Sequence, residues 1–329
     1  MARCLYLFSS GKLHRKDNSL VFEKEDGKRV HLPVEQTESI CVFGELDLNK
    51  RVLEFLTKNR IPVHFFNRYD YYSGSFYPRE YLNSGFLILE QSRFYSSYEK
   101  RVELARVLVK GATENMLQVI RYYARRGKSF GSIVDNLENL RSTLDKCNTI
   151  EHIMAIEGNF RDLYYKCFDV ITENAAFQFV DRSRRPPLNR MNALISFGNS
   201  LLYTTCLGEC YRTNLDPRIG FLHATNFRSF SLNLDIAEIF KPLLVDRLIF
   251  SLINKGQLKA ESFGKHLEGI YLNDKGKEIF VREYDEKLKT TLKHSQLKRN
   301  VSYRYLIRLE LYKLEKHIIG EKDYIPYRG

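Results

Sequence analysis

The sequence predicts an α+β protein with a small β-rich domain at residues 1–86 and a larger all-helical domain at residues 90–329. In the first part, short apolar runs alternate with turn-forming residues. Beyond Gly85, apolar residues recur every three or four positions, which is the period of an amphipathic helix. Gly and Pro are sparse in this second part and fall mostly between the periodic segments. A chain of 329 residues is long enough for two such domains.

Runs of aromatic and branched residues predict strands in the first domain. They are Cys4-Leu-Tyr-Leu-Phe8, Ser19-Leu-Val-Phe22, Val30-His-Leu32, Ser39-Ile-Cys-Val-Phe43 and Pro62-Val-His-Phe-Phe66. We expect tight hairpin turns at Ser10-Gly11, Asp17-Asn18 and Asp26-Gly27, because Gly and Asn tolerate positive φ. One amphipathic helix is expected at residues 48–59.

The second domain begins with a long periodic segment. Phe94, Tyr98, Val102 and Val109 fall on one helical face there. The same period predicts helices at 93–126, 148–175, 188–211, 231–254 and 302–319.

The chain is basic, with 52 Lys+Arg against 40 Asp+Glu and a net charge of +12. Residues 1–85 contribute only +2 of this excess, and the remainder contributes +10. A basic surplus in one part favours a polyanionic partner such as DNA, because neutralising phosphates releases counterions.

Six cysteines show neither a CxxC pair nor the spacing of zinc ligands. Cys206 and Cys210 lie four apart in an apolar helical segment, where we expect buried thiols. Without a signal peptide or an apolar run near 18 residues, a cytoplasmic location with no membrane association is expected.

Three segments carry polar groups that could bind a metal within otherwise apolar helical patterns. In the first, Glu157 lies in the middle of the run Ile153-Met-Ala-Ile-Glu157-Gly158. A carboxylate there is costly unless it is paired or bound to a cation. The alternative to a metal is an ion pair with Arg161, four residues further on.

The second segment is Gly220-Phe-Leu-His223, a histidine that follows a turn and an apolar pair. A metal ligand and a hydrogen-bonded core histidine are both compatible with this pattern.

The third segment runs from Ser231 to Pro242 and places Asp235 and Glu238 three residues apart, on one helical face. Like charges in this arrangement repel, and a divalent cation is one reason to keep them together. The alternative is a surface network in which Glu238 pairs with Lys241 or Arg247.

Together these segments offer two carboxylates and an imidazole, a ligand set suited to Mg²⁺ or Mn²⁺. With few protein ligands, such a site leaves positions for water and phosphate oxygens, as phosphoryl transfer requires. Basic residues nearby are candidates for contacts with a DNA backbone. They are Arg182, Arg184, Arg185, Arg228 and Lys241.

In their order along the chain, these segments resemble the CRISPR-associated adaptation integrase family, endonucleases that insert new spacers into a CRISPR array. The matching motifs are Met154-Ala-Ile-Glu157-Gly158, Arg184-Arg-Pro-Pro187, Asn192-Ala-Leu-Ile-Ser-Phe-Gly198, Leu201-Leu-Tyr203, Asp216-Pro-Arg-Ile-Gly-Phe-Leu-His223, Ser231-Leu-Asn-Leu-Asp-Ile-Ala-Glu238, Phe240-Lys-Pro242, Asp246-Arg247, Ser302-Tyr-Arg304, Leu309-Glu310 and Tyr324-Ile-Pro-Tyr327. They extend over most of residues 90–329, whereas the first domain carries no motif as sharp.

The resemblance implies a divalent metal held by Glu157, His223 and Glu238, with Asp235 as a further ligand or as a residue that orients the site. It also implies dimerisation through the β-rich domains and a small ferredoxin-like companion that bridges two dimers.

Two departures resemble the subtype I-B branch of the family. The interval from His223 to Asp235 is one residue longer than in many members, and Lys241 stands where Arg is usual. The longer interval leaves the role of Arg228 open.

The function expected from this resemblance is metal-dependent transesterification, in which the 3′-hydroxyl of a DNA fragment attacks a phosphodiester of double-stranded DNA at the array. Branched DNA is a further expected substrate, and water in place of the hydroxyl gives cleavage. Two alternatives stay open at this point: a structure-selective repair nuclease, and a non-catalytic scaffold that binds nucleic acid.

Overall fold

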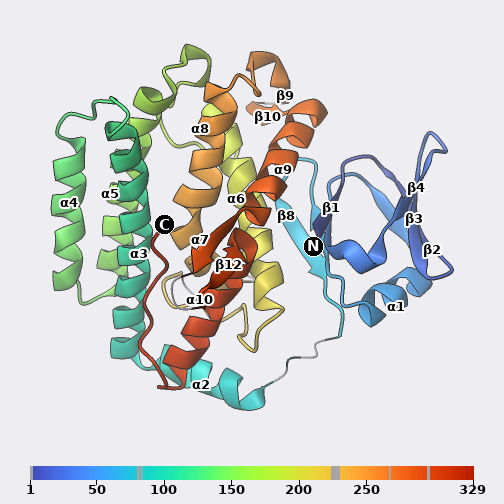
Figure 1. Ribbon diagram of the computed structural model, residues 1–329, viewed down its shortest axis with the longest axis horizontal. Coiled ribbons are helices and arrows are strands. Elements are labelled where there is room, and N and C mark those ends of the chain that lie inside the picture. Colours follow the sequence, from blue (N-terminus) through green and yellow to red (C-terminus); the bar gives the residue numbers. More distant parts are fainter. Residues whose placement is uncertain (1–2, 80–81, 83, 224–229, 267, 295–296) are drawn as a thin grey trace. The chain divides into compact units, whose positions relative to one another are not determined.

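The computed structural model describes residues 3–79, 82, 84–223, 230–266, 268–294 and 297–329 (Figure 1). The chain divides into two compact units, Met1–Asn83 and Ser84–Gly329. A β-rich unit followed by a larger helical one confirms the predicted α+β class. The predicted start of the second domain at residue 90 falls inside a helix that begins at Gly85. Within the described parts of the chain, none of the helices is both long and apolar enough to span a membrane.

The first unit contains a four-stranded sheet in the order β1-β5-β7-β8. Its strands are β1 (Arg3–Leu7), β5 (Thr37–Val42), β7 (Val63–Phe66) and β8 (Tyr72–Phe76). The first three are parallel, and β8 is antiparallel to β7.

A second sheet has the order β4-β3-β2-β6. Its strands are β2 (Gly11–Lys16), β3 (Ser19–Lys24), β4 (Arg29–Leu32) and β6 (Leu46–Leu48). The hairpins expected at Asp17-Asn18 and Asp26-Gly27 are confirmed, with φ of 55° at Asp17 and 79° at Gly27.

The hairpin predicted at Ser10-Gly11 is wrong, because the chain passes there from one sheet to the other. Gly11 is needed for a different reason than a turn. A Cβ at this position would lie 2.3 Å from the carbonyl oxygen of Glu23 on the neighbouring strand.

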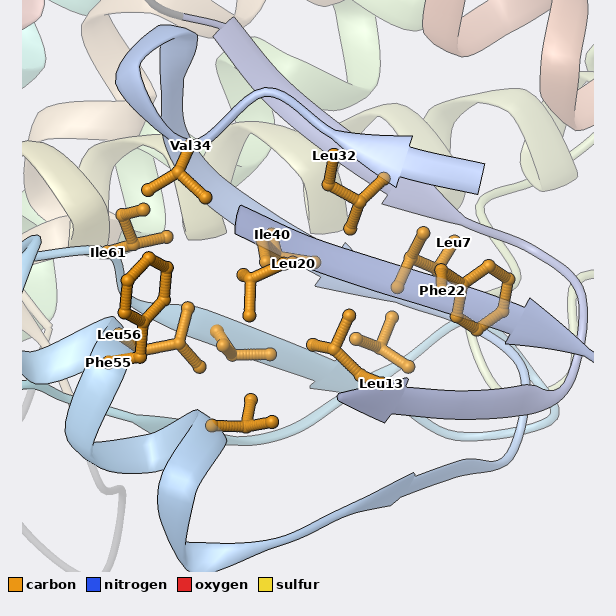
Figure 2. Packing of buried hydrophobic residues seen from close by; sticks show 13 residues of the cluster. Leu7, Leu13, Leu20, Phe22, Leu32, Val34, Ile40, Phe55, Leu56 and Ile61 are labelled. Atoms are coloured by element: carbon orange, nitrogen blue, oxygen red, sulfur yellow. The ribbon is translucent and has the colours of Figure 1, made fainter. Parts of the chain in front are cut away.

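The core of this unit is built from apolar side chains of both sheets and of helix α1 (Lys50–Lys58), as Figure 2 shows. Asn49 caps α1 by accepting a hydrogen bond from the amide of Val52. From the helix, Val52, Phe55 and Leu56 are buried. They pack with strand residues such as Leu20 and Ile40.

The second unit is a helical assembly. Its helices are α2 (Gly85–Ser96), α3 (Tyr98–Ala124), α4 (Ile133–Ser142), α5 (Ile150–Thr172), α6 (Arg190–Cys210), α7 (Leu232–Phe240), α8 (Arg247–Asn254), α9 (Asp274–Lys289) and α10 (Tyr303–Ile318). Short 3₁₀ segments occur in both units, at Val34–Gln36, Thr143–Lys146, Ala175–Phe177 and Ala260–Ser262. Cys206 and Cys210 are buried thiols on α6, as predicted.

The helix predicted at 231–254 covers the right residues, but the structure has no single regular helix there. Between α7 and α8 lies a π-helical turn, Lys241–Asp246. Pro242 within it has no amide proton to donate, which disfavours regular α-helical bonding at this point. Such π-helical turns often occur at functional sites.

The prediction that this unit is all-helical is wrong in detail, because it also holds two short antiparallel hairpins. One pairs β9 (Phe263–His266) with β10 (Gly269–Leu272), and the other pairs β11 (Thr291–His294) with β12 (Arg299–Ser302). Each strand has four residues, many of them polar, so no alternating apolar pattern marks it.

Candidate active site

Helix α5 supplies Glu157 and Arg161, which lie one turn apart on the same helix. Thr149 caps the helix by accepting from the amide of His152. Arg161 donates from Nε to Glu157 Oε1 at 2.7 Å. Its Nη2 donates both to Glu157 Oε1 and to Glu238 Oε2 of α7. One guanidinium therefore joins the carboxylates of two helices.

Helix α7 presents Asp235 and Glu238 on one face, and both are buried. Oε1 of Glu238 accepts a hydrogen bond from Nζ of Lys241, at the start of the π-helical turn. Lys241 also lies over the ring of Tyr203, 4.9 Å from its centroid. The two oxygens of Glu238 are thus bound by two different cations, Arg161 and Lys241.

The segment that leads to His223 has no regular secondary structure and is fixed by the Asp235 carboxylate. Asp235 accepts hydrogen bonds from the amides of Phe221, Leu222 and His223, at 2.5, 3.0 and 2.9 Å. Gly220 permits this close approach, since a Cβ there would lie 2.9 Å from Asp235 Oδ2 and 2.7 Å from the carbonyl carbon of Ser231.

The same carboxylate orients the imidazole of His223. Nδ1 lies 2.8 Å from Asp235 Oδ1. A carboxylate only accepts, so Nδ1 carries a proton, and when the ring is neutral Nε2 keeps its lone pair. Nε2 lies 3.9 Å from Glu238 Oε1. The nitrogen that could bind a metal therefore faces Glu238.

The charges in this cluster stabilise one another. Burial alone would raise the pKa of Glu238, but Arg161 and Lys241 outweigh it and hold this pKa well below its usual range. For Lys241, the neighbouring Glu238 carboxylate overcomes burial and raises the pKa. For His223, burial is likewise outweighed by Asp235, so the imidazole pKa is raised.

Glu157, His223 and Glu238 come from α5, an irregular segment and α7, and they meet in one cluster. Two ion pairs that the sequence allows as alternatives to a metal are also present, Glu157 with Arg161 and Glu238 with Lys241. The second pair is buried rather than part of a surface network. Arg247, the other partner considered for Glu238, lies over the ring of Tyr122 instead.

The donor types of this cluster fit a divalent cation: two carboxylates and an imidazole nitrogen held in the right tautomer by a carboxylate. Among the described residues, no three His, Cys, Asp or Glu side chains already form a metal-binding group. Arg161 and Lys241 instead take up the carboxylate oxygens.

The DNA-contact candidates have different surroundings. Arg184 and Arg185 are exposed. Arg182 is partly buried and donates to Asn192 Oδ1 at 3.0 Å and to Ser196 Oγ at 3.1 Å. Lys241 is 5% exposed and belongs to the carboxylate cluster. Arg228 lies outside the described residues.

Two features of the site were not predicted from the sequence. The sequence pattern indicates Arg161 only as a partner of Glu157, whereas in the structure it also binds Glu238. Asp246 is buried, and its Oδ2 has no hydrogen-bond partner within the part of the chain that the structure describes. The Asp246-Arg247 motif marked this position without indicating its burial.

The fold and the cluster define a two-unit protein. Its helical unit gathers two acidic residues and a histidine around two buried basic side chains, Arg161 and Lys241. The family model of CRISPR associated protein Cas1 matches residues 5–286. A relative from Thermodesulfovibrio yellowstonii, a CRISPR-associated endonuclease Cas1, is 55% identical over 99% of both chains. The chain belongs to the Cas1 family.

Solved structures share this fold. A Cas1 protein from Thermotoga maritima superposes with a TM-score of 0.89 at 50% identity, covering 98% of each chain. A casposase bound to its integration product has the same fold, with a TM-score of 0.88 over 98% of this chain and 92% of its own, at 19% identity.

Proposed function

We propose that this protein is a divalent-metal-dependent DNA endonuclease and integrase that inserts spacer DNA into a CRISPR array. Membership of the Cas1 family supports the general activity. The observation that carries the site assignment is the convergence of three helix and loop segments. Glu157 and Glu238 bond the same nitrogen of Arg161, and His223 Nε2 lies 3.9 Å from Glu238.

In this proposal, Glu157, His223 and Glu238 hold Mg²⁺ or Mn²⁺, which would offset negative charge on the phosphate oxygens. Asp235 keeps the proton of His223 on Nδ1, so that Nε2 faces the cluster. Because Nε2 would have no free lone pair when bound to the metal, the histidine acts as a ligand and not as a general base. The Glu238 carboxylate stays ionised at neutral pH, because its burial is outweighed by its cationic neighbours and its pKa stays low.

The proposed reaction is attack by the 3′-hydroxyl of a DNA fragment on a phosphodiester at the repeat border. The leaving group is the 3′-oxygen of the attacked strand. Water as the nucleophile gives hydrolysis. The casposase of the same fold is described with its integration product, which supports double-stranded or branched DNA as the substrate class. We also propose a homodimer formed through the β-rich unit, a small ferredoxin-like companion, and a cytoplasmic location.

A joining assay on a repeat-containing duplex tests the proposal. We expect joined product only with a fragment that ends in a 3′-hydroxyl, and only when Mg²⁺ or Mn²⁺ is present. A matched fragment ending in a 3′-deoxy sugar is the control, and the companion is added or omitted in each arm.

Two other results of this assay would favour the alternative functions. Metal-dependent cleavage without any joining, even with the companion, would indicate a structure-selective repair nuclease. DNA binding without metal-dependent cleavage or joining would indicate a non-catalytic scaffold.

A further inference from the structure

Arg161 occupies an unusual position for a positively charged side chain. It is 7% exposed, and its guanidinium binds both acidic residues that we propose as metal ligands. Three of its hydrogen bonds go to these two carboxylates. Arg161 therefore takes up oxygen atoms that a bound cation would need.

We propose that Arg161 is a built-in counter-cation, which holds the acidic cluster together when no metal is bound and must release it when metal binds. The inference rests on the proposed function, because it takes Glu157 and Glu238 as metal ligands. It assigns Arg161 a positioning and regulatory role, distinct from that of the ligands.

The physical basis is the cost of buried negative charge. Glu238 is 4% exposed, and an unpaired carboxylate at such a depth is strongly destabilising. Arg161 compensates this charge in the metal-free protein. A metal that bonds the same oxygens gains less, because the contacts with Arg161 must first be broken.

Lys241 cannot replace Arg161 in this role. Its Nζ binds Oε1 of Glu238, whereas Arg161 binds Oε2 and also reaches Glu157. A planar guanidinium with several donors can bridge two carboxylates, which suits this position better than a single ammonium. Removal of Arg161 should therefore leave both Glu157 and Glu238 without this cationic partner.

The test is a calorimetric titration of metal-stripped protein with Mn²⁺, made with the full chain. Arg161→Met should bind Mn²⁺ about tenfold more tightly than the wild type, since the competing cation is gone. The same variant should melt at a lower temperature in chelator, and Mn²⁺ should raise its melting temperature by more than it raises that of the wild type.

A matched control is Arg308→Met, because Arg308 binds the buried Glu209 on α6 at 2.7 Å. It should lower the melting temperature in chelator without changing the affinity for Mn²⁺. The second variant, Arg161→Lys, keeps the charge but not the bridging geometry and should give an intermediate affinity. If Arg161→Met does not fold in chelator, the affinity of Arg161→Lys for Mn²⁺ decides, and it should be tighter than that of the wild type.

The outcomes separate the two proposals. If wild-type protein binds Mn²⁺ and the Arg161 variants bind it equally or more weakly, the counter-cation role is wrong while the proposed function stands. If the wild type binds no Mn²⁺, both are overturned.

Discussion

Glu157 and Glu238, on different helices, are joined by one atom, Nη2 of Arg161, which donates to both carboxylates. Helices α5 and α7 thus bring together acidic groups that are far apart in the sequence. Nε2 of His223 faces the Glu238 carboxylate, and Asp235 fixes the tautomer of the imidazole.

Replacement of either carboxylate by its amide should abolish metal-dependent joining. We expect Glu157→Gln and Glu238→Gln to reduce the joining rate by at least about a hundredfold, because each removes a charged oxygen ligand of the metal that would offset charge on the reacting phosphate. Binding of duplex DNA in chelator, measured by fluorescence anisotropy, should change little in either variant. Wild-type joining in one of them would remove that residue from the site.

Loss of the charge on Asp235 should weaken the hydrogen bonds that hold both the His223 imidazole and its backbone segment in place. Asp235 accepts from three backbone amides and from His223 Nδ1. We expect Asp235→Asn to weaken Mn²⁺ binding by roughly 10- to 100-fold, as for other residues that orient a metal ligand. Calorimetry measures this directly, and an unchanged affinity would mean that the orientation of His223 does not matter for the metal.

Two glycines of the site motifs should differ in their tolerance of a methyl group. At Gly220 a Cβ would lie 2.7 Å from a backbone carbon and 2.9 Å from Asp235 Oδ2, so Gly220→Ala should cost about 1–3 kcal/mol of unfolding free energy. At Gly158, inside α5, a Cβ would meet nothing within 4 Å. Gly158→Ala should therefore stabilise the helix by about 0.5–1 kcal/mol. Chemical denaturation measures both, and equal effects would contradict the packing described around Gly220.

The buried Asp246 should make the protein less stable as the pH rises. Burial raises the pKa of its carboxyl from 3.8 to about 7. The folded state therefore binds a proton that the unfolded chain releases, so this contribution to stability is complete below about pH 4 and is lost as the pH rises to about 7. Asp246→Asn should raise the melting temperature relative to the wild type at pH 8 and change it less at pH 5. Thermal unfolding in chelator checks this, and a uniform shift at both pH values would contradict it.

Local sequence signals predicted much of the fold. Asp17-Asn18 and Asp26-Gly27 predicted two hairpins because positive φ favours few residue types. The helical period correctly marked α5 and α6. It did not separate α2 from α3, which part at Ser97, where the backbone is extended (φ −79°, ψ 97°) within a continuous apolar period. It also missed α9, whose sequence is rich in charged residues.

The candidate site was only partly predictable. Carboxylates within apolar runs are costly, so Glu157 and Glu238 could be singled out, and the family resemblance joined them to His223. The partners of Arg161 could not be deduced, because its bond to Glu238 depends on how α5 packs beside α7. Asp246 was hidden for the same reason, since its burial depends on tertiary packing of the π-helical turn.

The anomalous diffraction signal of Mn²⁺ in crystals of the wild-type protein tests whether Glu157, His223 and Glu238 hold one metal ion. We expect one peak within bonding distance of Glu157, of Glu238 and of Nε2 of His223, with Arg161 withdrawn from at least one carboxylate. A peak elsewhere, with Arg161 still bridging Glu157 and Glu238, would contradict it.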